Sequence, residues 1–294
     1  MALGRIKEAV KKGKILISDG AWGTFLQKKG LEPGQCPELW CLQRREDVFD
    51  VAKSYVDAGS DIIGTNSFGG SSFKLEHFGC ADKVSQINQA AASISRQAIG
   101  DKGWVIGSVG PTGKMLVMGD VTKDDLYKAF GEQIRALEKG GADAVCIETM
   151  SDIDEAISAV KAARDNTGLE VISTYTFEKT IQGEYRTMMG ISPGDALKAS
   201  IQAGADIVGT NCGNGFAGMI EIVKQIRKVD SDIAVLVHAN AGLPQNIDGK
   251  DVFPETPEDM ANQVKDLISA GANIIGGCCG TTPEHIIAIA KAAR

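Results

Sequence analysis

The feature of this sequence that most restricts its fold is a short motif that occurs four times along the chain. Each copy contains a glycine, one small residue, an Asp or Asn, and then an apolar run. A glycine in this place is typical of the left-handed residue that ends a helix, and the polar residue is typical of a tight turn. Each copy therefore predicts a helix that ends and leads directly into a strand. The four copies are Ala58-Gly59-Ser60-Asp61-Ile62, Gly140-Gly141-Ala142-Asp143-Ala144, Ala203-Gly204-Ala205-Asp206-Ile207 and Ala270-Gly271-Ala272-Asn273-Ile274.

Short apolar runs alternate with amphipathic stretches from one end of the chain to the other. The runs that predict strands are 14–18, 61–65, 104–109, 143–147, 170–176, 206–210, 233–238 and 273–277. The stretches that predict helices are about 46–58, 82–98, 123–139, 152–165, 194–203, 216–229, 257–270 and 283–293. Strands that alternate with helices form parallel sheets, and eight such units close into a barrel. We therefore predict an α/β fold, a single (β/α)8 TIM barrel, with residues 1–294 as one domain.

The repeat also predicts which side chains meet at one end of such a barrel. By this alignment the motifs lead into strands two, four, six and eight. The carboxyl ends of barrel strands lie on one rim, where barrel enzymes carry their active sites. We expect the residues seven and eight positions after the repeat glycines to converge there. These residues are Asn66, Ser67, Glu148, Thr149, Asn211, Cys212, Cys278 and Cys279.

Charge and apolar patterning exclude several classes of function. The net charge of -7 disfavours a nucleic-acid partner, because such proteins usually present a basic surface. No uninterrupted apolar run approaches the roughly 20 residues that cross a bilayer, so we expect no membrane partner. Residues 1–12 predict a short amphipathic helix rather than a signal peptide. We therefore expect a cytoplasmic protein whose thiols stay reduced.

Three of the seven cysteines are placed to hold a metal ion. An odd number of cysteines, two of them adjacent, argues against a disulfide framework. Cys278 and Cys279 follow one predicted strand and are framed by glycines, which leave the backbone room to turn both sulfurs toward one point. Cys212 follows the predicted strand at 206–210. Three thiolates from two strand ends suit tetrahedral Zn2+ with its fourth position open or labile.

The fourth zinc position and the remaining cysteines complete this hypothesis. His238 and His285 could each supply a fourth ligand, although we expect His285 to lie on the surface of the last helix. A zinc ion with three anionic ligands would deprotonate a thiol substrate, whose ordinary pKa is about 8.5, and leave it able to attack a methyl group. The other cysteines are expected to be small buried hydrophobic residues. They are Cys36, Cys41, Cys80 and Cys146.

Together these motifs resemble the homocysteine S-methyltransferase family, which consists of zinc-dependent barrels. The resemblance covers nearly the whole chain, and it is greatest for the homocysteine-binding module of cobalamin-dependent methionine synthase. Its most specific motif is Gly-Gly-Cys-Cys-Gly-Thr-Thr-Pro at 276–283. The individually modest motifs are Asp19-Gly20-Ala21-Trp22-Gly23-Thr24, Gly64-Thr65-Asn66-Ser67-Phe68-Gly69, Gly110-Pro111, Glu148-Thr149-Met150, Asn211-Cys212 and Asn240-Ala241-Gly242.

The resemblance implies roles for individual residues of this chain. These roles agree with the chemistry of an amino-acid thiol, because acids pair with its ammonium and exposed N–H groups bind its carboxylate. Asn66 matches a substrate-binding position, and a turn-forming role is equally open for it. The implied zinc ligands are Cys212, Cys278 and Cys279, with Asn240 as a weak oxygen ligand when no thiol is bound. The implied homocysteine contacts are Asp19 and Glu148 for its amino group, and the backbone at Gly20 and Ala21 for its carboxylate.

The implied reaction is zinc-dependent transfer of a methyl group to the thiol of homocysteine, which forms methionine. Gly280 after the two cysteines, and Asn66-Ser67-Phe68-Gly69, look like the cobalamin-linked branch of the family rather than the S-methylmethionine branch. The chain has no Asp-x-His-x-x-Gly corrinoid-binding signature. We therefore expect the donor to be methylcobalamin on a separate corrinoid protein.

Other functions stay open at the level of the sequence. The donor could be S-methylmethionine or betaine. The acceptor could be a different small thiol, because His238-Ala239 stands where relatives often have an acidic or aromatic residue and Pro. A different class of function is a non-catalytic zinc-binding barrel that serves as an assembly subunit. A phosphate-binding barrel isomerase is a weaker alternative, because the double cysteine would have no role in it.

Overall fold

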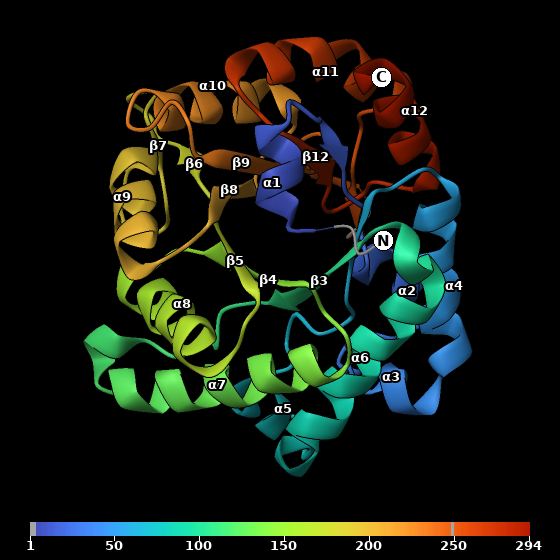
Figure 1. Cartoon of the computed structure of the whole chain (residues 1–294), viewed down its shortest axis with the longest axis vertical. Helices are drawn as coiled ribbons and strands as arrows, with labels where there is room; N and C mark the ends of the chain where they lie inside the picture. The colour runs from blue at the N-terminus through green and yellow to red at the C-terminus, as the bar shows by residue number, and fades with distance from the viewer. Residues whose placement is uncertain (1–3, 248–249) are drawn as a thin grey trace.

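Eight parallel strands close into a ring at the centre of the molecule (Figure 1). The computed structural model describes residues 4–247 and 250–294. The strands follow the order β1-β12-β9-β8-β5-β4-β3-β2, and a parallel bridge between Ser18 and Ile62 joins the two ends of this order. The predicted (β/α)8 TIM barrel is therefore confirmed. The strands are β1 (Leu16–Ile17), β2 (Ile62–Gly64), β3 (Trp104–Val109), β4 (Ala144–Met150), β5 (Glu170–Tyr175), β8 (Ile207–Asn211), β9 (Ala234–Ala239) and β12 (Ile274–Gly277).

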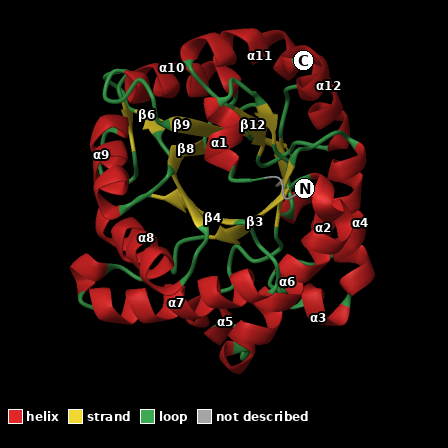
Figure 2. Ribbon diagram, viewed as in Figure 1, coloured by secondary structure: helices red, strands yellow, loops and turns green. Residues whose placement is uncertain are grey.

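A ring of helices covers the outer face of the barrel (Figure 2). The buried side chains between helices and strands form the largest hydrophobic cluster, which includes Val51, Phe130 and Val223. Each such side chain stabilises the fold by about 2 kcal/mol when it leaves water, so this layer contributes most of the driving force. The helices that follow successive strands are α4 (Arg45–Asp57), α6 (Val84–Ile99), α7 (Lys123–Lys139), α8 (Ile153–Asn166), α9 (Pro193–Ala203), α10 (Phe216–Arg227), α11 (Pro257–Ala270) and α12 (Pro283–Ala293).

A second hydrophobic cluster fills the interior of the barrel. It contains inward-facing strand residues such as Ile106 and Cys146. Helix α1 (Ile6–Lys11) lies across the amino ends of the strands and adds Ile6 and Ala9 to the same cluster (Figure 1). Within the described residues, α1 therefore covers the amino end of the barrel interior.

The predicted helix ends at the repeat are confirmed. Gly59, Gly141, Gly204 and Gly271 have φ values of 97°, 99°, 109° and 115°, in the left-handed region that glycine adopts without strain. The polar residue of each motif then accepts a hydrogen bond from a backbone N–H of the preceding barrel strand. These bonds run from Ile17 to Asp61, from Val105 to Asp143, from Val171 to Asp206 and from Val235 to Asn273.

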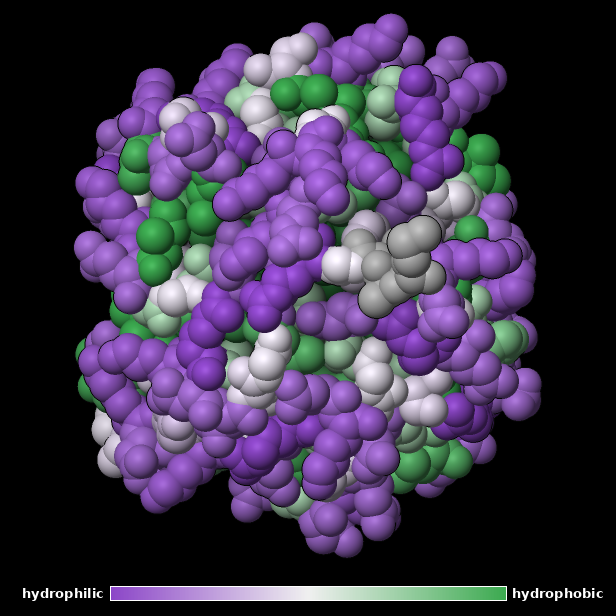
Figure 3. Space-filling model, in the orientation of Figure 1, coloured by the Kyte–Doolittle hydropathy of each residue, from purple (hydrophilic) through white to green (hydrophobic). Residues whose placement is uncertain are grey.

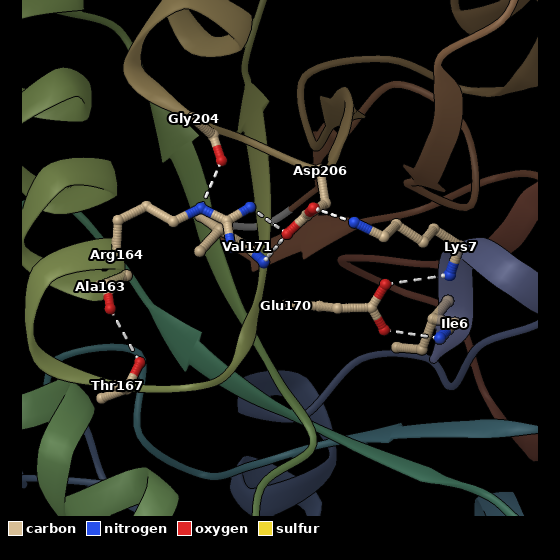
Figure 4. A network of polar contacts seen from close by, with 9 residues as sticks. All are labelled: Ile6, Lys7, Ala163, Arg164, Thr167, Glu170, Val171, Gly204 and Asp206. Carbon is tan, nitrogen blue, oxygen red and sulfur yellow. Dashed lines mark hydrogen bonds and ion pairs between the residues drawn. The ribbon is translucent and has the colours of Figure 1, made fainter. Parts of the chain in front are cut away.

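An arginine joins each copy of the repeat, which the sequence motif alone did not predict. Figure 4 shows one copy, in which Arg164 donates to the carbonyl of Gly204 and to the carboxylate of Asp206. Lys7 of α1 reaches the same carboxylate with its ammonium group at 2.5 Å. The backbone N–H groups at the start of α1 donate to Glu170 at 2.5 and 3.1 Å. The other arginines in equivalent places are Arg96, Arg227 and Arg294.

Short elements occupy the long segments between strands and helices. Among the described residues, no helix is long and apolar enough to cross a bilayer. Hydrophilic side chains cover most of the face that carries α1 (Figure 3). The short elements are α2 (Gly23–Lys28), α3 (Trp40–Gln43), α5 (Ser72–Glu76), η1 (Ala81–Lys83), η2 (Gly100–Lys102), η3 (Leu116–Met118), β6 (Glu178–Lys179), β7 (Tyr185–Arg186), β10 (Gln245–Ile247) and β11 (Lys250–Val252).

Candidate active site

Three cysteines meet at the carboxyl end of the barrel. Cys212 directly follows β8, and Cys278 and Cys279 directly follow β12. Their three sulfur atoms lie within 4.8 Å of one another. Zinc binds thiolates at about 2.3 Å in tetrahedral geometry, so the donor set and its spacing fit that metal. The structure therefore brings together the three residues that the sequence assigned to zinc.

Backbone hydrogen bonds to β9 hold both cysteine segments in place. Cys212 N–H donates to the carbonyl of His238 at 2.9 Å, and Cys278 N–H donates to the carbonyl of Ala239 at 2.6 Å. Cys279 accepts a bond from Ala241 N–H at 3.0 Å. The central strand between them thus sets the distance between the two segments.

The three thiols share their protons unequally. Cys212 accepts hydrogen bonds from the thiols of Cys278 and Cys279 and from Asn240, and these lower the pKa of its thiol. The same hydrogen bonds to Cys212, together with burial, raise the pKa values of Cys278 and Cys279. Because the sites are coupled, these shifts belong to the group as a whole. Without metal the cluster favours one thiolate, and a divalent cation would favour all three.

Asn240 brings a side-chain amide to the cysteine group. It follows β9, is buried, and contacts Cys212 through its side chain. Its Oδ1 is buried and has no hydrogen-bond partner among the described residues. A carbonyl oxygen without a partner beside three sulfurs fits a weak metal ligand, since buried polar atoms are otherwise almost always bonded.

The two histidines considered from the sequence do not join the metal group. Within residues 4–247 and 250–294, the His, Cys, Asp and Glu side chains that could hold a metal together are the three cysteines alone. The expectation that His285 lies on the surface is wrong, because it is only 7 % exposed. Its Nδ1 accepts a bond from Thr282 N–H at 3.1 Å, and its Nε2 lies 3.0 Å from the carbonyl of Glu255. It therefore caps the start of α12 and ties down the segment before α11.

Asp19 brings a buried carboxyl group to the same end of the barrel. It lies just after β1, where its oxygens accept hydrogen bonds from Trp22 Nε1 at 2.8 Å, Gly64 N–H at 2.7 Å and Ser18 Oγ at 3.1 Å. Burial raises the pKa of Asp19 to about 6, although these hydrogen bonds lower it in part. A cationic group in the cavity would favour its ionised form.

Glu148 is the second acid of the site. It lies on β4 and accepts a hydrogen bond from the hydroxyl of Ser108. The pKa of Glu148 is raised to about 7, mainly by burial and to a smaller extent by the nearby charges of Asp19 and Cys212, while the hydrogen bond from Ser108 lowers it in part. The part of Glu148 that remains accessible faces the cavity, so a ligand there can contact it directly.

One cavity of about 300 Å³ connects these groups. Its wall contains the three cysteines, both acids, His238 and the segment from Asp19 to Thr24. A larger groove of about 1210 Å³ lies between the β6–β7 hairpin, α10 and α11, and its wall is formed by surface side chains such as the ion-paired Lys224. The smaller cavity is the one that combines thiols with acids.

The two backbone N–H groups expected to bind a carboxylate, those of Gly20 and Ala21, differ in whether the protein already uses them. Ala21 N–H already donates to Thr281 Oγ1 at 3.1 Å. No described residue accepts a hydrogen bond from Gly20 N–H, and a Cβ at Gly20 would lie 2.8 Å from both Tyr55 and Thr281. The close packing requires glycine here, and Gly20 is the better donor of the two for an anion.

Asn66 contacts the cavity wall but uses its side chain for the protein itself. Its Nδ2 donates to the carbonyl of Pro37 at 2.7 Å and to Cys41 Sγ at 3.6 Å. These bonds tie Asn66 to the segment of Pro37 and Cys41, and its substrate-binding role stays a prediction. The four cysteines outside the trio are buried, as expected.

Several contributing residues were missed from the sequence. Ser108 and Trp22 position the two acids, and Glu38 is buried in the cavity wall, where it accepts a bond from Gly69 N–H at 2.7 Å. Trp22 lies in a motif that the sequence had singled out, so its presence there was a usable signal. Ser108 and Glu38 come from other segments, and no local pattern marks them.

Comparison with known proteins agrees with this geometry. Residues 16–293 match the homocysteine S-methyltransferase family. This chain belongs to the homocysteine S-methyltransferase family. Methionine synthases of Mycobacterium leprae (strain TN) and Mycobacterium tuberculosis (strain ATCC 25618 / H37Rv) are 31% and 30% identical to it over 95% of its length. The chain spans only 24% of the length of each of these relatives.

Solved structures support the fold of this homocysteine S-methyltransferase family member. The metallated form of the homocysteine methyltransferase MmuM from Escherichia coli has a TM-score of 0.77 and 20% identity, and the match covers 96% of this chain and 97% of that one. The apo form of the same protein has a TM-score of 0.74 and 19% identity over the same shares. At this level of identity the likeness concerns the barrel itself.

Proposed function

We propose that this chain is a zinc-dependent S-methyltransferase that moves a methyl group to the thiol of homocysteine and forms methionine. The observation that carries the proposal is that one cavity wall combines three clustered sulfurs with the buried Asp19 and the partly exposed Glu148. Homocysteine has a thiol at one end and an ammonium at the other. Each end therefore has a matching set of groups in the same cavity.

Cys212, Cys278 and Cys279 would hold the zinc ion, with Asn240 Oδ1 in the fourth position until a thiol replaces it. When bound there, zinc would lower the pKa of the substrate thiol from its ordinary value of about 8.5 and supply a thiolate at neutral pH. The sulfur of homocysteine then provides the electron pair of the new S–C bond. The donor keeps the electron pair of the bond that breaks.

The acids would orient the other end of the substrate. Asp19 and Glu148 have raised pKa values of about 6 and about 7 because they are buried, and a bound ammonium would offset the cost of their charges. Gly20 N–H would receive the substrate carboxylate. With both ends fixed, the sulfur is held in one position for attack, which is the main advantage of such a site.

For the methyl donor we propose a methylcorrinoid protein. The similarity to two methionine synthases supports this choice over S-methylmethionine or betaine. We also infer a cytoplasmic location, which agrees with cysteines that are all unpaired among the described residues.

A direct test is to incubate the zinc-loaded chain with homocysteine and each donor in parallel, and to measure methionine. We expect methionine with methylcobalamin or a methylated corrinoid protein. Transfer only from S-methylmethionine or betaine would replace the proposed donor. No transfer from any donor, with no thiol-dependent change in the visible spectrum of the cobalt-substituted protein, would favour a non-catalytic zinc-binding subunit. Parallel reactions with other small thiols identify a different acceptor.

A further inference from the structure

His238 has a ring nitrogen without a hydrogen-bond partner among the described residues. His238 lies on β9, is only 7 % exposed, and forms part of the wall of the cavity described above. Its Nε2 is buried and makes no hydrogen bond with any described residue. Buried side-chain nitrogens are nearly always bonded, because an unbonded one forfeits its hydration without compensation. An unpartnered nitrogen on a residue that lines the cavity therefore points to a partner that the described residues do not supply.

The ring of His238 lies over β12, next to the backbone of Asp19. Its β12 neighbour in the register is Gly276, and a Cβ on Gly276 would lie 2.9 Å from His238 Cδ2 and 2.7 Å from the carbonyl oxygen of Asp19. The ring thus packs inside the barrel over the glycine, close to Asp19. The backbone carbonyl of His238 accepts the bond from Cys212 N–H at 2.9 Å, so the same residue also borders the cysteine segment.

The metal is not the partner of this nitrogen. His238 is outside the metal group formed by the three cysteines in the described chain, and Asn240 is the residue that contacts Cys212. The partner is then a bound water or a group of the substrate, at the part of the cavity whose wall Asp19 and His238 share.

The chemistry of the neighbours decides which substrate group this is. An ammonium has three donors, and two of them can be taken by Asp19 and Glu148. Both oxygens of Asp19 already accept hydrogen bonds from the protein, so Asp19 has little capacity for a second N–H of the ammonium. A third, neutral hydrogen-bond acceptor would therefore bind the remaining N–H. A carboxylate at this place would meet two acids and be repelled. A neutral imidazole accepts through Nε2 when its proton is on Nδ1.

We infer that His238 Nε2 accepts a hydrogen bond from the ammonium of the thiol substrate, beside Asp19 and Glu148. The inference rests on the proposed function, and it narrows the substrate class to thiols that carry a positively charged amino group. His238 then selects which thiol receives the methyl group, because a thiol without the amino group leaves His238 Nε2 without a hydrogen bond.

The test compares two thiols that differ only in the amino group. Homocysteine and 4-mercaptobutyrate are titrated calorimetrically into the zinc-loaded wild-type chain, H238F, H238L and H238Q, with zinc content and circular dichroism as checks. We expect H238F to weaken homocysteine binding about tenfold, since hydrogen bonds to charged groups are among the stronger ones. Binding of 4-mercaptobutyrate should change by less than about twofold. H238Q keeps an acceptor and should retain most of the affinity. H238L gives the same comparison if H238F does not fold.

Three outcomes overturn the inference. If H238F and H238L weaken both thiols equally, the ring only packs against the carbon chain. If they lose zinc, His238 acts at the metal. If the wild type binds both thiols and the variants bind them as tightly, His238 has no role in selection while the proposed function stands. If the wild type binds neither thiol, the proposed function itself fails.

Discussion

The side chain of Asn211 holds the backbone of Thr149 in a left-handed conformation. Asn211 Oδ1 accepts a bond from Thr149 N–H at 2.8 Å, and its Nδ2 donates to Thr149 Oγ1 at 2.7 Å. Thr149 has φ 60° and Cys212 has φ 58°, and these are the non-glycine residues with positive φ in the described chain. Asn211 therefore connects the turn after Glu148 to the turn that presents Cys212.

This connection predicts coupling between positions 149 and 211. Asn211→Ala should lower the free energy of unfolding by about 2–3 kcal/mol, because it leaves buried groups unbonded. Thr149→Gly removes the steric cost of the positive φ. Asn211→Ala should therefore lower the free energy of unfolding by less in a Thr149→Gly background than in the wild type. Urea unfolding of both single variants and the double variant measures the coupling, which we expect to be about 1 kcal/mol. Strict additivity of the two changes would contradict the connection.

The three cysteines should be needed together for zinc. Cys212→Ser or Cys278→Ser should reduce zinc from about one ion per chain to a small fraction after dialysis, because two thiolates no longer complete the site. Cys80→Ala is the matched control, since this buried cysteine packs in another cluster and should leave zinc content unchanged. Elemental analysis of the purified variants gives the answer. Full zinc content in Cys212→Ser would remove Cys212 from the site.

Glu148 should lower the free energy of unfolding at high pH, and it should strengthen the binding of homocysteine. Its pKa is raised from 4.5 to about 7, so the folded state keeps a proton that the unfolded state has lost, and the free energy of unfolding falls as pH rises from 4.5 to about 7. The free energy of unfolding of metal-free Glu148→Gln, measured relative to that of the metal-free wild type, should therefore rise by about 2–3 kcal/mol from pH 5 to pH 8. The same variant should bind homocysteine at least tenfold more weakly. A stability difference that is constant with pH would show that the acid is not desolvated.

Binding of homocysteine should weaken in acid for a reason that a simple thiol does not share. Below about pH 7 Glu148 takes up a proton, and below about pH 6 Asp19 does as well, so the ammonium loses its partners. The ratio of the dissociation constants of homocysteine and 4-mercaptobutyrate should rise about tenfold from pH 8 to pH 5.5. Thiol and metal titrations affect both ligands and cancel in this ratio. A flat ratio would mean that the two acids do not contact the amino group.

The arginine of the repeat should stabilise the amino end of the barrel. Arg164→Met removes the bonds to Gly204 and Asp206 and should lower the free energy of unfolding by about 1–2 kcal/mol. Arg186→Met is the control, because the ion pair of Arg186 with Glu184 is exposed and worth little. Thermal unfolding of both variants compares them. Equal effects would assign no special role to the repeat contact.

Local patterns in the sequence determined the elements and their order. Alternating apolar runs and the glycine motif are properties of neighbouring residues, and they gave the strands, the helices and the closed barrel. Strand ends of a barrel meet on one rim, so the convergence of Cys212 with Cys278 and Cys279 also followed from the order of elements. The family pattern added Asp19, Glu148 and Asn240.

Only the tertiary structure decided how these groups are set and which neighbours act on them. The burial that raises the pKa values of Asp19 and Glu148 depends on atoms from many segments, and no local pattern encodes it. The same holds for Asn211, whose partner lies 62 residues away, and for His285, whose surroundings come from another loop. Sequence spacing fixes which residues reach the rim, because the repeat of the backbone is regular. Packing fixes their charge, their partners and the unbonded nitrogen of His238, because these depend on contacts between distant segments.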